Sequence, residues 1–196
     1  MTVLIGLTGS IGMGKSTTAQ IFANEGCAVW DADAAVHRLY AKHGDAVAPM
    51  QEAFPDAIIN GAVSREKLKK ILRQQPEALR DIERIVHPLV AADRADFIEN
   101  AASNIVVLDI PLLFETGADK AMDVTVCVSI DADTQKARVM ARGHMTEQDF
   151  QTVLSKQMPD EEKRKKADYV VTTETRESAA QQVKAILGTI REQMNA

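Results

Sequence analysis

The sequence predicts an α/β fold in which a parallel β-sheet is covered by helices on both faces. Five short apolar runs recur along the chain and carry few charged residues, as strands do when both faces of their sheet are buried. Amphipathic segments with helical spacing separate these runs, and this alternation is typical of parallel sheets. A glycine-rich stretch directly follows the first run. These three observations favour a three-layer α/β/α domain with a five-stranded parallel sheet.

The composition is that of an ordinary globular protein and argues against several functional classes. The 196 residues are 45% hydrophobic and 26% charged, enough for one domain or one domain with insertions. With 23 basic and 28 acidic side chains the net charge is −5, which argues against binding to nucleic acids or membrane surfaces. No apolar stretch approaches the ~20 residues that cross a bilayer, and no signal peptide is recognisable. We expect a cytoplasmic protein, either a monomer or a weak homo-oligomer.

The first apolar run, Val3–Leu7, predicts a buried strand. It leads into Gly9–Thr17, which fits the phosphate-binding pattern of glycine, four residues, glycine, lysine, and serine or threonine. Behind this stretch, apolar residues recur at helical spacing until Gly26, a residue typical of a helix C-terminus. Strand, glycine loop and helix in this order are the context that the pattern requires. The stretch therefore predicts a binding site for a nucleoside triphosphate.

The residue types in this loop suit a polyphosphate ligand. Its glycines let the backbone curl so that successive N–H groups point at phosphate oxygens, and the helix that follows adds its positive end. Lys15 can reach the β- and γ-phosphates, and the Ser16 hydroxyl can hold Mg²⁺. Met13 is expected to contribute its backbone only. The nucleotide-binding residues predicted in this way are Gly12, Met13, Gly14, Lys15, Ser16 and Thr17.

The interval 34–103 is mostly helical in pattern and is longer than a single crossover requires. Helical spacing and capping residues predict helices over 35–44, 45–54, 64–72 and 79–90. Residues 58–61 are expected to form a turn, and Pro88 to kink or break the last of these helices. We expect 34–103 to form a helical subdomain that binds the acceptor substrate.

The remaining strands and helices complete the sheet. Apolar runs predict strands over 27–30, 104–110, 124–130 and 169–171, and helices are expected over 132–142, from the capping box at 146–149, and over 180–194. Cys27 and Cys127 lie in such strands and should be buried, reduced thiols. The expected nucleotide-binding core comprises 1–33, 104–137 and 167–196, and the segment 138–166 is expected to be a lid.

Acidic residues follow three of the predicted strands, at the edge where such sheets bind their ligands. Asp33 could accept an alcohol proton and orient the oxygen for in-line attack, although a strand-end aspartate can equally cap a helix. In one arrangement Asp31 is the cap and Asp33 the base. Asp109 is either a water-mediated Mg²⁺ ligand or a turn residue, and Asp131 or Asp133 should cap the next helix.

Arg138 and Arg142 lie four residues apart and therefore share one helix face. Two guanidinium groups aimed at a γ-phosphate would stabilise charge on the transferring group, whereas the alternative is a solvated helix face. With a phosphate loop in the same chain, the functional role is favoured. The basic run 163–166 follows three acidic residues and is expected to belong to a solvated lid helix.

Two classes of phosphate-loop protein compete: an enzyme that moves phosphate to a small molecule, and a nucleotide-gated switch. A GTPase switch needs Asp-x-x-Gly and Asn/Thr-Lys-x-Asp motifs, and neither occurs here. Transporter-type ATPases need a signature with adjacent glycines, which the chain lacks. A small-molecule kinase remains.

Further motifs resemble the dephospho-CoA kinase family. They are Asp31-Ala32-Asp33, Arg65, Ile85-Val86-His87-Pro88, Pro111-Leu112-Leu113-Phe114-Glu115, Gln135 with Arg138 and Arg142, Gln157, and Ala167-Asp168-Tyr169-Val170-Val171. Together with the phosphate loop they cover nearly the whole chain in order. The loop is shared by many families, but the His-Pro and Pro-Leu-Leu-Phe-Glu blocks together are specific.

The resemblance implies transfer of the γ-phosphate of ATP to the ribose 3′-hydroxyl of dephospho-coenzyme A, the last step of coenzyme A synthesis. In that family the residue matching Asp33 is the expected base. The arginines matching Arg138 and Arg142 belong to the lid side of the ATP site, and the positions matching Arg65 and His87 lie on the acceptor side. The catalytic residues would then be Asp33, Lys15 and Arg138.

The chain departs from the family pattern in two places. Thr172-Thr173 stand where Asp-Asn is usual, and the asparagine expected at Thr173 would help to place the adenine. Gly143 stands where an aspartate commonly follows the second lid arginine. The choice between ATP and GTP therefore stays open. The alternatives are a shikimate kinase, whose triple glycine is absent here, and an ATP-binding regulator without enzymatic activity.

Overall fold

The computed structural model describes residues 2–196, which divide into two compact units. One unit combines the chain up to Val29 with Ala101–Ala196, and the other is Trp30–Asn100. Each unit has a hydrophobic core of its own. Over residues 2–196, every helix is too short or too polar to cross a bilayer.

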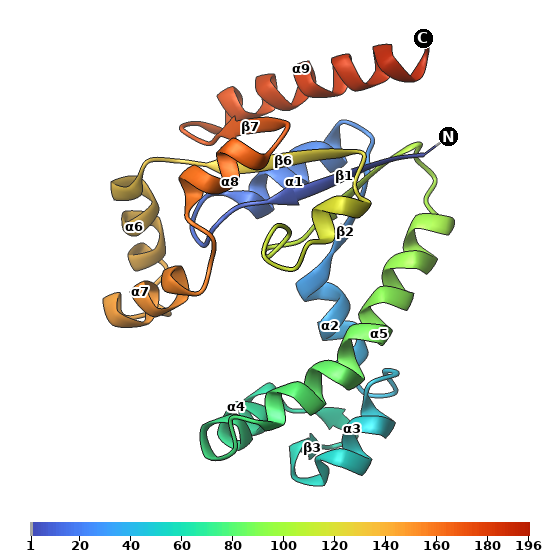
Figure 1. Ribbon diagram of the computed structural model, residues 1–196, viewed down its shortest axis with the longest axis vertical. Coiled ribbons are helices and arrows are strands. Elements are labelled where there is room, and N and C mark those ends of the chain that lie inside the picture. The colour runs from blue at the N-terminus through green and yellow to red at the C-terminus, as the bar shows by residue number, and fades with distance from the viewer. Residues whose placement is uncertain (1) are drawn as a thin grey trace. The chain divides into compact units, whose positions relative to one another are not determined.

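A five-stranded parallel sheet forms the middle of the first unit, as predicted (Figure 1). The strands are β1 (Val3–Thr8), β2 (Ala28–Asp31), β5 (Ile105–Asp109), β6 (Val124–Ser129) and β7 (Tyr169–Thr172). Their order is β2-β5-β1-β6-β7, so β1 is central. In the register of β1 with its two neighbours, Ile5 lies opposite both Val107 and Val124. The phosphate loop therefore leaves the sheet from its middle strand.

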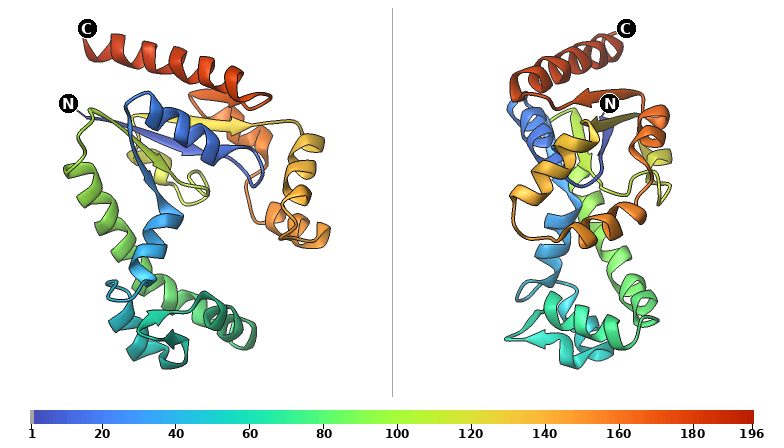
Figure 2. Two further views of the ribbon diagram at one scale, coloured as in Figure 1. Left: turned by 180° about the vertical axis from the view of Figure 1, so that it is seen from behind. Right: turned by 90° about the vertical axis from the view of Figure 1, so that its left-hand side faces the viewer.

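Helices cover both faces of this sheet. α1 (Lys15–Asn24) and α9 (Arg176–Met194) lie side by side on one face, and α8 (Asp160–Lys166) lies on the other (Figure 2). On the α8 side Leu113 packs so closely over Gly6 that a Cβ atom there would lie 2.9 Å from its side chain. The unit also contains η2 (Ala118–Ala121), α6 (Ala132–Ala141) and α7 (Glu147–Ser155). The predicted three-layer α/β/α fold is confirmed.

The core between the sheet and its α1–α9 face explains why this unit folds as it does. Ile5 and Leu7 alternate along β1 and are fully buried, as are Phe22 of α1 and Leu187 of α9. Burying one large apolar side chain contributes about 1.5–3 kcal/mol. Side chains repeat their direction every two residues in the strand and every 3.6 residues in the helices. The apolar residues of each element therefore lie on one face and meet in a single core.

The second unit is mostly helical and has a separate core. Its elements are α2 (Ala32–Tyr40), α3 (Val47–Ala53), η1 (Pro55–Ala57), β3 (Ile58–Ile59), β4 (Ala62–Val63), α4 (Arg65–Gln74) and α5 (Ala78–Glu99). Leu39, Met50, Leu68, Ile82 and Val86 form the centre of the core. These residues come from α2, α3, α4 and α5, so each of the four helices buries one apolar stripe.

Residues 58–63 form a two-stranded antiparallel hairpin, where the sequence predicts only a turn. Ile58 lies opposite Val63, and Ile59 opposite Ala62. The two connecting residues, Asn60 and Gly61, both have positive φ, 52° and 78°. Two such residues in succession are typical of the tight turn that matches strand twist. The strands were missed because two residues are too few to show a period.

Of the kink or break predicted at Pro88, the break does not occur, because α5 runs without interruption from Ala78 to Glu99. In Figure 1 the ribbon of α5 changes direction partway along its length, which is how a helix accommodates a proline that cannot donate a hydrogen bond. Ile82 and Val86 precede the proline and are buried in the core of the second unit. Their packing offsets the single hydrogen bond that Pro88 removes.

Both cysteines are free and buried, as predicted, although only Cys127 lies in a strand and Cys27 directly precedes β2. Burial raises the pKa of the Cys27 thiol to about 11 and that of the Cys127 thiol to about 12. A thiol is nucleophilic only as the thiolate. Neither cysteine is therefore suited to covalent chemistry at neutral pH.

Candidate active site

The loop between β1 and α1 has the backbone geometry that phosphate binding needs. Gly12 and Gly14 have φ angles of 80° and 94°, in the left-handed region that other residues enter only with strain. Gly14 is also the N-cap of α1, and no side chain caps this helix end. The N–H groups of the first turn of α1 therefore lack a side-chain acceptor, and an anion can take that place.

Close packing around the loop adds a second reason for its glycines. A Cβ atom on Gly12 would lie 2.6 Å from Val139 of α6, and one on Gly14 would lie 3.0 Å from the hydroxyl of Thr173. Substitution at either position would push these neighbours away and change the path of the loop. The loop is thus held between α6 and the segment after β7.

Lys15 pairs with Asp109, whose side chain is almost completely buried at the end of β5. The pairing follows from the sheet, because Leu7 of β1 lies opposite Asp109 in the register. From its position after a strand, Asp109 could be either an indirect Mg²⁺ ligand or a turn residue. In the structure its carboxylate holds the lysine of the phosphate loop.

Oxygen atoms suited to Mg²⁺ lie near the start of α1. Ser16 is exposed in the first turn of this helix, one residue after the lysine that pairs with Asp109. A hydroxyl and a carboxylate are ligands that Mg²⁺ accepts together with waters and phosphate oxygens. Within residues 2–196 no group of three or more His, Cys, Asp or Glu side chains could hold a metal ion. The donor set near the loop fits an ion shared with a nucleotide.

The side chain of Met13 has a role that the sequence does not reveal. The sequence predicts a backbone contribution only, yet the Met13 side chain is 2% exposed and its sulfur accepts a hydrogen bond from the Ile130 N–H at 3.2 Å. A long, polarisable thioether fills irregular gaps in a core. Met13 therefore anchors the loop to the end of β6 with its side chain.

Arg138 is joined to the loop through Thr173, the position where the sequence departs from the family pattern. Its guanidinium donates to the Thr173 hydroxyl at 2.9 Å and to the Thr173 carbonyl at 2.6 Å. The same hydroxyl donates to the Met13 carbonyl at 2.6 Å. Arg142 ends α6 one turn later and is exposed. Thr173 is therefore engaged with the loop and with Arg138 at once.

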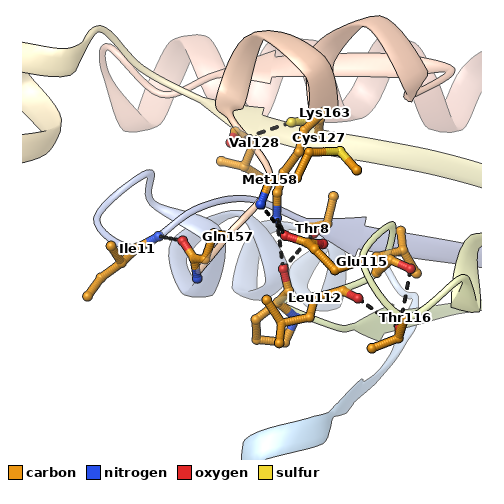
Figure 3. Close-up of polar contacts among 12 residues, drawn as sticks. Thr8, Ile11, Leu112, Glu115, Thr116, Cys127, Val128, Gln157, Met158 and Lys163 are labelled. Carbon is orange, nitrogen blue, oxygen red and sulfur yellow. Dashed lines mark hydrogen bonds and ion pairs between the residues drawn. The ribbon is translucent and has the colours of Figure 1, made fainter. Parts of the chain in front are cut away.

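An ion pair between Lys163 and Glu115 fastens α8 to one face of the sheet (Figure 3). Lys163 is fully buried, and its Nζ lies 2.9 Å from Glu115 and 3.0 Å from the Pro111 carbonyl. The Thr8 hydroxyl at the end of β1 donates to that same carbonyl at 3.0 Å. The prediction of a solvated helix is wrong for Lys163, although the other three basic residues of the run are exposed. Because α8 packs on β6, one of its faces must point inward, and no charge pattern in the run distinguishes it.

These contacts lower the pKa of Glu115. Burial alone would raise the pKa of this carboxyl, but the N–H of Met158 and the ammonium of Lys163 together hold it below its ordinary value. A carboxyl whose pKa is lowered by folding stabilises the folded state at any pH above its unfolded-state pKa, which is near 4.5. This contribution is lost as the pH falls through the folded-state pKa.

We expect Lys163→Met to lower the free energy of unfolding by about 3–5 kcal/mol, because it leaves the Glu115 carboxylate without its buried partner. The loss should be largest near neutral pH and should shrink as the pH falls through the folded-state pKa of Glu115, because the wild type then loses the contribution of the ionised carboxylate as well. Urea unfolding at several pH values from about 3 to about 8 measures both effects.

The matched control is Lys165→Met on the same helix, whose partner Glu161 is four residues away and exposed. Exposed pairs of this kind contribute about 0.3–0.5 kcal/mol. Equal losses of stability in the two variants would contradict a special role for Lys163.

In the second unit, Asp31 caps α2 by accepting a hydrogen bond from the Ala34 N–H at 2.8 Å. Asp33 lies in the first turn of α2 and its side chain is exposed. The Arg65 guanidinium donates to the Asp33 carbonyl at 3.4 Å, which brings two predicted acceptor-side residues together. His87 is exposed on α5. The cap is thus assigned to Asp31, and the carboxylate of Asp33 remains available to solvent.

Comparison with known proteins identifies the family. A family model described as dephospho-CoA kinase matches residues 3–178. The dephospho-CoA kinase of Ruegeria pomeroyi is 61% identical over 191 residues, which cover 97% of each chain. The crystal structure of TT1252 from Thermus thermophilus is similar with a TM-score of 0.85 and 32% identity, over 96% of this chain and 97% of that chain.

A further solved structure supports the fold. The dephospho-CoA kinase from Campylobacter jejuni superimposes with a TM-score of 0.70 and 24% identity, over 98% of this chain and 100% of that chain. The family match extends over both units of the structure and over every motif from the phosphate loop to the residues after β7. The chain therefore belongs to the dephospho-CoA kinase family, and it is a kinase.

Proposed function

We propose that the chain transfers the γ-phosphate of ATP to the ribose 3′-hydroxyl of dephospho-coenzyme A. The observation that carries this proposal is the glycine loop at the centre of the sheet, with left-handed Gly12 and Gly14 leading into Lys15. The family match supplies the acceptor. Within the cytoplasm, which the two reduced and buried cysteines favour, the protein would act as a monomer or a weak homo-oligomer.

The residues from Gly12 to Thr17 would hold the triphosphate through backbone N–H groups and through Lys15. When nucleotide binds, the Lys15 ammonium would exchange its contact with Asp109 for the β- and γ-phosphate oxygens. Ser16 would be a ligand of Mg²⁺, which neutralises charge on the phosphates when it is bound. The buried carboxylate keeps the lysine in position while no nucleotide is present.

Asp33 would act as the base for the acceptor. Its exposed carboxylate in the first turn of α2 can accept the proton of the 3′-hydroxyl and orient the attacking oxygen. Arg65, which already contacts the backbone of Asp33, would bind the acceptor together with His87. Capping by Asp31 supports this role, because α2 then does not need Asp33 at its N-terminus.

Arg138 and Arg142 would stabilise the charge on the transferring phosphoryl group. The contact of Arg138 with Thr173, which itself bonds to the Met13 carbonyl, supports this role because it holds the guanidinium beside the loop. In this proposal residues 1–33, 104–137 and 167–196 are the nucleotide-binding core, 34–103 bind dephospho-coenzyme A, and 138–166 act as a lid whose moving part ends before Gln157, since α8 is anchored on β6.

The deciding experiment is an assay of ADP release coupled to an optical readout, with Mg-ATP and one acceptor at a time. The acceptors are dephospho-coenzyme A, shikimate, adenosine monophosphate and gluconate. We expect turnover to rise above the acceptor-free rate only with dephospho-coenzyme A. A rise with shikimate alone would establish the competing kinase, and no rise with any acceptor would contradict the proposal.

A further inference from the structure

Two glutamine side chains hold the backbone of Ile11 in the middle of the phosphate loop. The Ile11 N–H donates to the side-chain oxygen of Gln157 at 3.2 Å (Figure 3). The Ile11 carbonyl accepts a hydrogen bond from the side-chain nitrogen of Gln135 at 2.7 Å. The N–H belongs to the peptide before Ile11 and the carbonyl to the peptide after it. Two successive peptide planes of the loop are therefore fixed.

Gln135 is well placed for this contact because α6 packs directly on the loop. Its side chain is 5% exposed, and its own carbonyl would lie 3.1 Å from a Cβ atom on Gly12. A buried amide requires hydrogen-bond partners, and the Ile11 carbonyl supplies one. The donor on Gln135 is thus held close to the glycine that turns the loop towards Lys15.

Gln157 lies between α7 and α8, in a segment that is itself tied down. The next residue, Met158, donates its N–H to Glu115 at 2.8 Å. Asp160, three residues after Gln157, accepts a hydrogen bond from the Ser129 hydroxyl at 2.6 Å. The buried pair of Lys163 and Glu115 fixes the start of α8 to the same place. The amide of Gln157 therefore reaches the loop from an anchored backbone.

Fixing these peptide planes matters because the loop is rich in glycine. Free glycine backbone loses more conformational entropy on ordering than any other residue, and that loss weakens ligand binding. Donors that are already oriented need no reorganisation when charge arrives. A clamp on Ile11 orients the N–H groups that follow it without using any of their donors.

We propose that Gln135 and Gln157 are positioning residues that preorganise the phosphate loop for ATP and keep their contacts when nucleotide is bound. The inference rests on the proposed binding of ATP by residues 12–17. Both glutamines belong to the first unit, whereas the acceptor residues Asp33, Arg65 and His87 belong to the second. Loss of the clamp should consequently weaken the binding of ATP and leave the binding of the acceptor unchanged.

The test uses Gln157→Leu, which removes the acceptor of the Ile11 N–H, and Gln151→Leu on exposed α7 as the matched control. For Gln157→Leu we expect the dissociation constant of Mg-ATP, measured by titration calorimetry, to rise about 3–10-fold, the effect of one hydrogen bond. The KM for dephospho-coenzyme A should stay unchanged, and the Ile11 amide proton should exchange faster with solvent. The control should match the wild type in all three measurements.

Each outcome is informative even where the variant is less stable, because the dissociation constant of Mg-ATP and the KM for dephospho-coenzyme A are both properties of the folded protein. A wild type that binds no Mg-ATP would refute the nucleotide site itself. If the wild type binds Mg-ATP and the Gln157→Leu variant binds it equally well or more tightly, the proposed clamp is wrong but the nucleotide site stands. Tighter binding would mean that Gln157 competes with phosphate instead of positioning the loop.

Discussion

Replacing Lys15 with methionine is expected to lower turnover by about 10³-fold or more. The lysine provides the only side-chain charge within the loop, and phosphoryl transfer depends almost entirely on positioning and on charge stabilisation. Methionine keeps the length and apolar character of the side-chain stem but removes the ammonium. Steady-state ADP release with saturating dephospho-coenzyme A measures the loss.

The ion pair with Asp109 requires a control, because Lys15→Met also leaves a buried carboxylate without this partner. The single variant should therefore be less stable to urea. The double variant Lys15→Met with Asp109→Asn removes the buried charge as well, so its stability should recover while its turnover stays low. A folded Lys15 variant with near wild-type turnover would show that the lysine does not contact the phosphates.

Asp33→Asn is expected to lower turnover by about 10²–10⁴-fold while the affinity for Mg-ATP stays unchanged. The low end of this range fits a loose transition state, in which the attacking oxygen needs little help from a base. Asparagine preserves the size of the side chain, and its Oδ1 can still accept a hydrogen bond from the hydroxyl, but it takes up no proton. Turnover is measured by ADP release and affinity by calorimetry.

Asp31 is a matched control for this substitution, since it lies two residues away and its role is structural. Asn caps helices as well as Asp does, so Asp31→Asn should preserve both α2 and turnover. If the two variants lose turnover equally, the effect comes from the local backbone and Asp33 is not the base.

The elements that could be predicted from the sequence are those whose signal is local. Apolar runs located the five strands because both faces of the sheet are buried. Helix starts were predictable at Ser64, Asp131 and Thr146, since each side chain bonds to an N–H only three residues ahead. The glycine pattern located the loop for the same reason, as its residues are consecutive.

The contacts that could not be predicted join residues far apart in the chain. Gln157 meets Ile11 across 146 residues, and Thr173 meets Met13 across 160. Lys163 carries the same charge as its exposed neighbours, and only the packing of α8 decides that it points inward. No spacing or composition in the sequence indicates which side chains the sheet and its helices bring together.

The three-layer fold, the phosphate loop and the order of the family motifs follow from the sequence, because periodicity, capping and turn chemistry act over a few residues. The contacts of Asp109 with Lys15, of Thr173 with Arg138 and the loop, and of the two glutamines with Ile11 follow from the folded chain alone. A hydrogen bond or an ion pair depends on the distance between two atoms, and for residues remote along the chain the folded backbone sets that distance.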